Sequence, residues 1–280
     1  MVKTPGVVRI AAVGDIHLGP AAHGPPIQTL LAQVAERADV LALCGDLTDR
    51  GDPEEGRQLG RALATVGVPV VAVLGNHDHE SGKVPELSRI LTEAGVQVLD
   101  GGDAFEIHGV GFAGVKGFAG GFGRRALGPW GEESIKHFVR QAVDEALKLE
   151  TSLSKLRTDR RVALLHYSPI AGTVEGEPRE IYPFLGSSRL EEPLIRYPVD
   201  VVFHGHAHHG TLEGKTVSGV TVFNVSLALL QRSFPEAPPF RVIELRTPQE
   251  QREDGQIERR MDRQADRRAE PQPGRRSVEA

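Results

Sequence analysis

The stretch that decides the fold is Val70-Val71-Ala72-Val73-Leu74-Gly75-Asn76-His77-Asp78, an apolar run that ends in a glycine and three polar residues. Two earlier stretches have the same form. Residues 7–13 are followed by Gly14-Asp15-Ile16-His17, and residues 40–44 by Gly45-Asp46-Leu47-Thr48-Asp49. Short apolar runs rich in β-branched residues are typical of strands buried on both faces of a parallel sheet. The sequence therefore predicts parallel strands that end in polar side chains.

Amphipathic stretches separate these strands and predict helices. Apolar residues recur at helical spacing in residues 27–38, 59–66, 87–94 and 135–147, and further strand-like runs cover residues 162–165 and 199–203. Alternation of this kind indicates an α/β fold. After Gly210 the pattern changes to residues 211–217, 220–225 and 240–245, which we expect to form antiparallel strands that complete the sheets.

Composition excludes several classes of protein. The chain has 280 residues, a formal net charge of −5 and one cysteine, Cys44. It has no apolar run of the ~18 residues that a membrane span needs and no secretory signal, so we expect no membrane association. The mild acidity argues against a nucleic-acid partner held by charge. A single cysteine forms no internal disulfide, and we expect a cytoplasmic location.

The last segment differs from the rest of the chain. Residues 248–280 contain 8 arginines, 8 acidic residues and no aromatic residue. Such a segment buries too little apolar surface to offset its ordering entropy. We therefore expect one folded domain over residues 1–247 and a disordered charged tail over residues 248–280.

Polar side chains at five strand ends indicate a metal site. Ligands of open α/β sheets bind beyond the carboxyl ends of the strands. The residues expected at that edge offer carboxylate, imidazole and amide groups, which suit a pair of divalent ions such as Mn, Fe or Zn. They are Asp15, His17, Asp46, Asn76, His166, His206 and His208. We expect the Asp46 carboxylate to bridge the two ions, because a shared anion lowers their repulsion.

This arrangement resembles the calcineurin-like metallophosphoesterases. Their pattern is D-x-H, GD-x-x-(D or N), GNH(D or E), a lone His and GH-x-H, and all five blocks stand here in that order. The resemblance covers residues 7 to about 226. It implies a four-layer α/β/β/α sandwich of two mixed sheets, with the metal site at the carboxyl-terminal ends of the strands.

The resemblance also implies a role for each residue. One metal would take Asp15, His17, Asp46 and His208, and the other would take Asp46, Asn76, His166 and His206. A hydroxide that bridges the ions would be the nucleophile. His77 would protonate or stabilise the leaving group, and Asp78 would orient its imidazole by accepting from the other ring nitrogen.

Three further residues are candidates for substrate binding. Arg50 follows Asp49 in Asp-Arg-Gly, a sequence that in the phosphoprotein-phosphatase branch of this superfamily places an arginine on the phosphate; pairing with Asp49 or Asp52 is the structural alternative. Tyr182 and Arg189 lie between two ligand-bearing strands and could stack on a base and hold a phosphate. The glycine-rich residues 101–123 predict a hairpin followed by a mobile loop, with a substrate lid as its functional interpretation.

The sequence thus predicts a dinuclear metal-dependent phosphoesterase that acts on a small-molecule phosphodiester, with cyclic nucleotides the first substrates to test. A compact domain with only a modest excess of basic residues near the site favours a diester over a dianionic monoester. A phosphomonoesterase or phosphoprotein phosphatase is the enzymatic alternative, and a non-catalytic binding scaffold on the same fold is another. A nuclease would need a basic groove that the sequence lacks. The sequence leaves protein partners undetermined.

Overall fold

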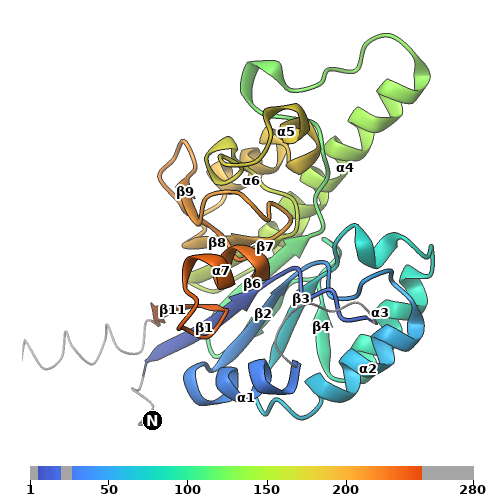
Figure 1. Cartoon of the computed structure of the whole chain (residues 1–280). Helices are drawn as coiled ribbons and strands as arrows, with labels where there is room; N and C mark the ends of the chain where they lie inside the picture. Colours follow the sequence, from blue (N-terminus) through green and yellow to red (C-terminus); the bar gives the residue numbers. More distant parts are fainter. Residues whose placement is uncertain (1–5, 20–26, 248–280) are drawn as a thin grey trace, which may run out of the picture.

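The computed structural model describes residues 6–19 and 27–247. The predicted tail at residues 248–280 lies outside the described residues. Within the described ranges the chain forms two packed sheets with helices on both sides (Figure 1). No helix in these ranges combines the length and the apolar character that crossing a membrane requires.

The first sheet contains five strands in the order β11-β1-β2-β3-β4. Its parallel strands are β1 (Val7–Val13), β2 (Val40–Cys44), β3 (Val70–Val73) and β4 (Val96–Val98). The edge strand β11 (Arg241–Arg246) runs antiparallel to β1. The connections form helices α1 (Ile27–Arg37), α2 (Pro53–Leu63) and α3 (Val84–Glu93), which cover the outer face of this sheet (Figure 1).

The second sheet contains six strands in the order β5-β6-β7-β8-β10-β9. These strands are β5 (Phe105–Ile107), β6 (Val110–Val115), β7 (Arg160–Leu165), β8 (Val201–His204), β9 (Glu213–Lys215) and β10 (Thr221–Asn224). Its helices are α4 (Glu133–Lys155), α5 (Tyr182–Leu185), α6 (Glu191–Arg196) and α7 (Leu227–Ser233). Short 3-10 helices cover His77–His79, Gly123–Arg125, Ala171–Thr173, Arg179–Ile181 and Ser188–Leu190.

Alternation along β7 shows how the layers pack. Val162 and Leu164 belong to the core between the two sheets, whereas Ala163 and Leu165 belong to a second core that also contains Leu149 of α4. Successive side chains of a strand point to opposite faces, so one face of this sheet packs on the first sheet and the other on helices. The predicted four-layer sandwich of two mixed sheets is confirmed.

Two details of the strand pairing differ from expectation. The strands after Gly210 are not simply antiparallel: β10 pairs antiparallel with β9 but parallel with β8, and β11 joins the other sheet. The predicted hairpin in residues 101–123 is present as β5 and β6, but β6 also pairs in parallel with β7. β6 is therefore an interior strand. Its second neighbour, β7, lies far along the chain, so the local sequence pattern does not indicate this pairing.

Candidate metal centre

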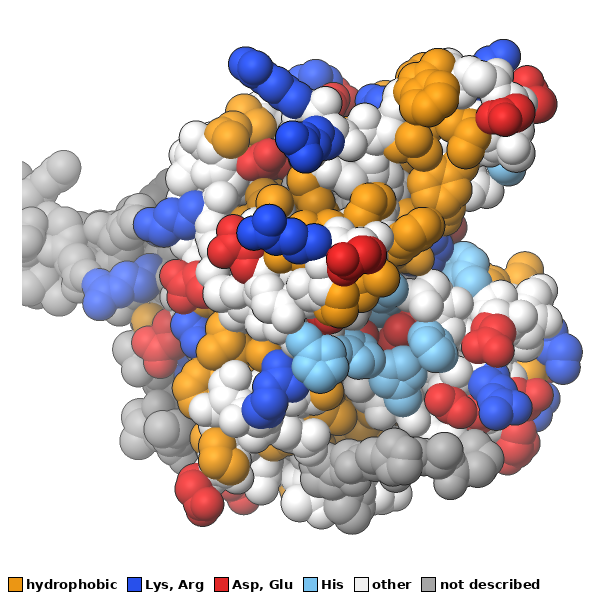
Figure 2. Space-filling view, turned by 45° about the horizontal axis from the view of Figure 1, so that its top comes forward, with side chains coloured by type: hydrophobic (Ala, Val, Ile, Leu, Met, Phe, Trp, Pro, Cys, Tyr) orange, Lys and Arg blue, Asp and Glu red, His pale blue; other side chains and the backbone are white. Residues whose placement is uncertain are grey.

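The predicted metal ligands lie at the carboxyl ends of strands from both sheets. Asp15 and His17 follow β1, Asp46 follows β2, Asn76 follows β3, and His166 follows β7. The remaining two, His206 and His208, follow β8. Figure 2 shows histidine side chains gathered on one face of the molecule, below a group of apolar side chains. The structure thus brings together residues up to 193 positions apart, as in the contact between Asp15 and His208.

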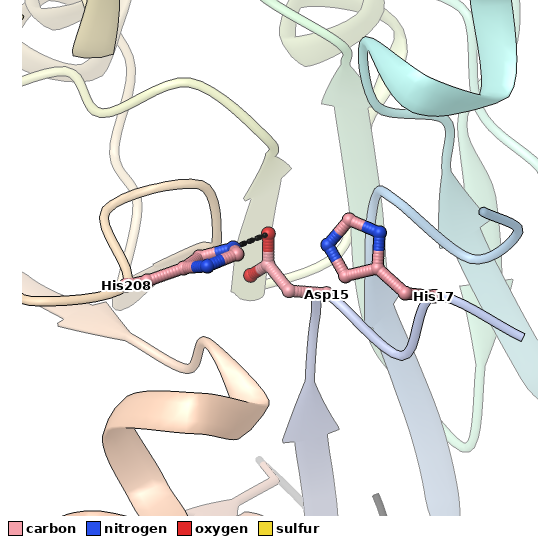
Figure 3. Close-up of side chains that lie close together, drawn as sticks. All are labelled: Asp15, His17 and His208. Carbon is pink, nitrogen blue, oxygen red and sulfur yellow. Dashed lines mark hydrogen bonds and ion pairs between the residues drawn. The ribbon is translucent and has the colours of Figure 1, made fainter. Parts of the chain in front are cut away.

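One group consists of Asp15, His17 and His208, each offering one ligand atom within 4.8 Å of the others. Nε2 of His208 lies 3.1 Å from Oδ1 of Asp15, and the His17 ring stands on the other side of that carboxylate (Figure 3). Burial would raise the pKa of Asp15, but the hydrogen bond with His208 and the charge of His166 outweigh it and lower the pKa. A lowered pKa favours the ionised carboxylate, the form that could ligate a metal ion.

The second group consists of Asp46, His166 and His206, again with ligand atoms within 4.8 Å of one another. Asn76 joins it, because its Oδ1 lies 2.9 Å from Nε2 of His166. His166 is fully buried. Burial alone would lower its pKa, but the charge of Asp46 and their contact raise the pKa to about 9.

Asp46 lies between the two groups. Its Oδ2 is 3.8 Å from Nε2 of His17 in the first group and 3.4 Å from Nε2 of His166 in the second. Its Oδ1 accepts a hydrogen bond of 2.8 Å from the backbone N–H of His77. Burial opposes ionisation, but His166 and the His77 amide lower the pKa of Asp46. One ionised oxygen facing both groups is the geometry that a bridging ligand requires.

The backbone at this site adopts conformations that most residues avoid. Asp15, His17, Asp46 and His206 all have positive φ, between 46° and 70°. A non-glycine residue in this region is uncommon, and such strain concentrates at functional sites. Gly75 is needed for a different reason, since a Cβ there would stand 2.1 Å from Oδ1 of Asp46.

The hydrogen bonds of the ring nitrogens indicate whether these histidines could hold divalent ions. Nε2 of His17 is buried and has no hydrogen-bond partner among the residues that the structure describes. In His166, Nδ1 donates to the Cys44 carbonyl at 3.0 Å, so Nε2, which faces oxygens of Asn76 and Asp46, is the atom at which a metal ion could take the place of a proton. Nε2 of His206 donates to the Phe184 carbonyl at 3.1 Å and leaves Nδ1 free to ligate. Imidazole nitrogens and oxygens that converge in this way suit cations, so these residues fit a pair of divalent ions.

The structure corrects one expected contact. Nδ1 of His77 lies 2.8 Å from the backbone carbonyl oxygen of Asp49, not against Asp78. The Asp78 carboxylate is fully buried and accepts from the N–H groups of Leu47, Thr48 and Gly75 and from the Thr48 hydroxyl. The prediction that Asp78 orients the His77 imidazole is therefore wrong. Asp78 instead ties the loop after β2 to the loop after β3, and the Asp49 carbonyl orients the imidazole.

We expect Asp78→Ala to destabilise the metal-free protein by about 3 kcal/mol or more, because the change leaves several buried donors without an acceptor. Urea unfolding of the chelator-treated variant measures the loss. Glu36→Ala is the control, since the Glu36 side chain is 74% exposed and pairs only across the surface with Arg37. Equal unfolding midpoints for both variants would contradict the assigned role of Asp78.

The predicted substrate residues have different surroundings. The Arg50 side chain is 75% exposed and its Nε lies 3.7 Å from Oδ2 of Asp49, which is the structural alternative considered above. Tyr182 packs against the small cluster formed by Val174, Leu185 and Ala207. Arg189 is half-buried, and its backbone N–H donates to the Ser187 hydroxyl at 3.3 Å. The segment around them does reach the site, through the contact between Phe184 and His206.

Sequence reasoning missed the backbone groups that position the site. The carbonyls of Cys44, Asp49 and Phe184 each contact an imidazole of a predicted site residue. Every residue has a backbone carbonyl, so residue types do not indicate which carbonyl will contact a side chain. Two phenylalanines of the predicted loop in residues 101–123 take packing positions: Phe118 lies 5.0 Å from Phe138 between ring centroids, and Phe122 packs on the cluster of Val174, Leu185 and Ala207.

Comparisons with known proteins found a matching family and similar solved structures. The family model for calcineurin-like phosphoesterases matches residues 8–210. Phosphopantetheinyl hydrolase from Mycobacterium tuberculosis has a similar structure, with a TM-score of 0.59, 15% identity, and coverage of 86% of this chain and 97% of that chain. The protein TT1561 of Thermus thermophilus has a TM-score of 0.51, 13% identity, and coverage of 86% of this chain and 99% of that chain.

The two solved structures support the fold, since their identities lie too low to carry more. The sequence matches no curated protein closely enough to count as a relative. The family model, in contrast, extends from β1 to the residues just after His208, over more than half of the chain. The chain belongs to the calcineurin-like phosphoesterase family.

Proposed function

We propose that this hydrolase of phosphoric esters cleaves small-molecule phosphodiesters at a centre of two divalent ions, Mn, Fe or Zn. The observation that carries the proposal is the position of Asp46, whose Oδ2 faces both imidazole groups. Family membership supports the ester chemistry. The single cysteine is buried, which is consistent with the reducing cytoplasm that we propose as its location.

Two bound divalent ions would neutralise phosphate charge and lower the pKa of bound water. The residues of the chain would supply the metal ligands and the hydrogen bonds that keep them in place. The Asp15 and Asp46 carboxylates and the Asn76 amide would hold the centre together with four histidines, His17, His166, His206 and His208. Asp78 keeps the two loops that carry Asp46 and Asn76 in register through its hydrogen bonds.

His77 is the proposed acid for the leaving group. Its Nδ1–H donates to the Asp49 carbonyl, which leaves Nε2 to carry or give up a proton. Its side chain is 38% exposed, so it can meet a substrate at the edge of the site. The ring also stands 4.6 Å from the His17 ring, which keeps it beside the proposed ligands.

A diester is proposed because Arg50, a predicted phosphate ligand, is turned toward the Asp49 carboxylate. A dianionic monoester would gain more from additional positive charge than a monoanionic diester. Phosphomonoester hydrolysis is the alternative.

The test is a comparison of substrates by Mn²⁺-reconstituted protein. We expect kcat/KM to be higher for bis(p-nitrophenyl) phosphate than for p-nitrophenyl phosphate, and cyclic AMP is the first natural diester to assay. A preference for the monoester would replace the proposal by the phosphomonoesterase alternative. Absence of hydrolysis of all three esters by metal-loaded protein would favour the non-catalytic scaffold.

A further inference from the structure

A lysine stands at the same edge of the second sheet as the proposed metal ligands. Lys116 directly follows β6, and β6 pairs with β7 so that Val115 lies opposite Leu165. Lys116 therefore lies next to His166, whose backbone N–H donates to the Lys116 carbonyl at 3.0 Å.

The direction of the Lys116 side chain follows from the pleat of β6. A Cβ on Gly114 would contact Val73 of the first sheet, so residue 114 faces the space between the sheets. Residue 116 lies two positions further along and has the same orientation. The Lys116 side chain thus starts on the face that carries His166, and its ammonium ends beside the Tyr167 ring at the edge of the sheet.

The neighbours of the Lys116 ammonium satisfy only part of its hydrogen-bonding capacity. Nζ donates to the Gly117 carbonyl at 2.8 Å, and it lies 5.0 Å from the Phe118 ring centroid and 5.1 Å from the Tyr167 ring centroid. An ammonium has three N–H donors. Aromatic faces attract a cation but are weaker acceptors than an anionic oxygen.

The acidic residues near Lys116 are occupied elsewhere. Glu145 accepts from the Gly117 N–H at 2.8 Å and from Lys148 at 2.9 Å, and Asp100 is 3.4 Å from the same Lys148. In the part of the chain that the structure describes, no carboxylate lies within 4.0 Å of Lys116.

One aromatic ring separates this ammonium from the proposed metal centre. The Tyr167 ring that faces Lys116 also lies 4.4 Å from the His206 ring and 5.5 Å from the His166 ring, between centroids. Tyr167 itself is buried, so the second group of a substrate with its phosphoryl group at the metal ligands would reach the half-buried Lys116 by passing beside this ring.

We propose that Lys116 forms an anion subsite beside the metal centre, which binds a second negatively charged group of the same substrate molecule. The group would be a further phosphate or a carboxylate, held by a charge-assisted hydrogen bond against the Phe118 and Tyr167 rings. This inference rests on the proposed phosphoesterase function and narrows its substrate class. A diester with a second anionic group would be preferred over cyclic AMP, which has only one.

The test measures equilibrium binding of substrate-like phosphonates to Mn²⁺-loaded protein by calorimetry. The probes are 3-phosphonopropionate, 4-phosphonobutyrate and 5-phosphonopentanoate, each compared with the alkylphosphonate of the same chain length. We expect at least one carboxylated probe to bind about tenfold tighter than its partner. Lys116→Met should remove this preference, because methionine keeps the apolar stem and lacks the charge, whereas Lys116→Arg should retain part of it.

Lys215→Met is the control, since Lys215 is an exposed residue of β9 and is not placed in the subsite. It should keep the wild-type preference. Equal binding of both probes of every pair by the wild type, or an unchanged preference in Lys116→Met, would overturn the subsite and leave the proposed function standing. Failure of the wild type to bind even the plain alkylphosphonates would also overturn the subsite, and hydrolysis of bis(p-nitrophenyl) phosphate by the same protein then decides the proposed function separately.

Discussion

Asp46→Asn is expected to lose most of its bound metal and nearly all turnover. The substitution keeps the shape of the side chain but removes the charge that faces His17 and His166. Two cations would then lie close together without the shared anion that offsets their repulsion. Elemental analysis of the purified variant and its kcat on a chromogenic diester measure both effects.

Asp100→Asn is the control for this change. Asp100 is 81% exposed and pairs with Lys148 away from the proposed ligands, so its loss should leave metal content and rate at the wild-type level. Full loading of Asp46→Asn with two ions, together with a wild-type rate, would show that Asp46 does not bridge.

His77→Ala should keep both metals and lose roughly 10²–10⁴-fold in kcat, the usual contribution of general acid–base catalysis. The size of the loss should depend on the leaving group. A nitrophenolate leaves without a proton, whereas an alkoxide such as a ribose oxygen needs one. The measurement is kcat for an aryl ester and for a ribose-type ester, each determined on the wild type and the variant.

Two other results would change the role of His77. Equal losses on both esters with metals retained would indicate that His77 positions the phosphate and does not donate a proton. Loss of a metal ion would make His77 a ligand, an arrangement that its position within 4.8 Å of ligand atoms of His17 and Asp49 makes worth testing.

The positions of the metal-site residues could be predicted because of a simple geometric rule. Buried parallel strands are recognisable by their β-branched runs, and their carboxyl ends meet at one edge. Asp15, Asp46 and Asn76 each follow such a run directly, and the structure places them together for that reason. The sequence pattern did not carry the left-handed backbone of Asp15 and Asp46, which depends on the loops around them.

Contacts made by backbone groups could not be predicted from residue identity. Asp78 was expected to face His77, but it accepts from the loop N–H groups of Leu47 and Thr48, and the His77 imidazole contacts the Asp49 carbonyl instead. The interior position of β6 in the second sheet was not predicted, for a related reason. Glycines in residues 101–123 indicate turns, whereas the parallel pairing of β6 with β7 depends on a strand about 50 residues further along the chain.

The central claim, a centre of two metal ions, is tested most directly by native mass spectrometry of chelator-treated protein titrated with Mn²⁺. The account predicts that the folded chain takes up two ions and that Asp46→Asn fails to reach this state. A wild-type chain that saturates with one ion, or with none, would contradict it.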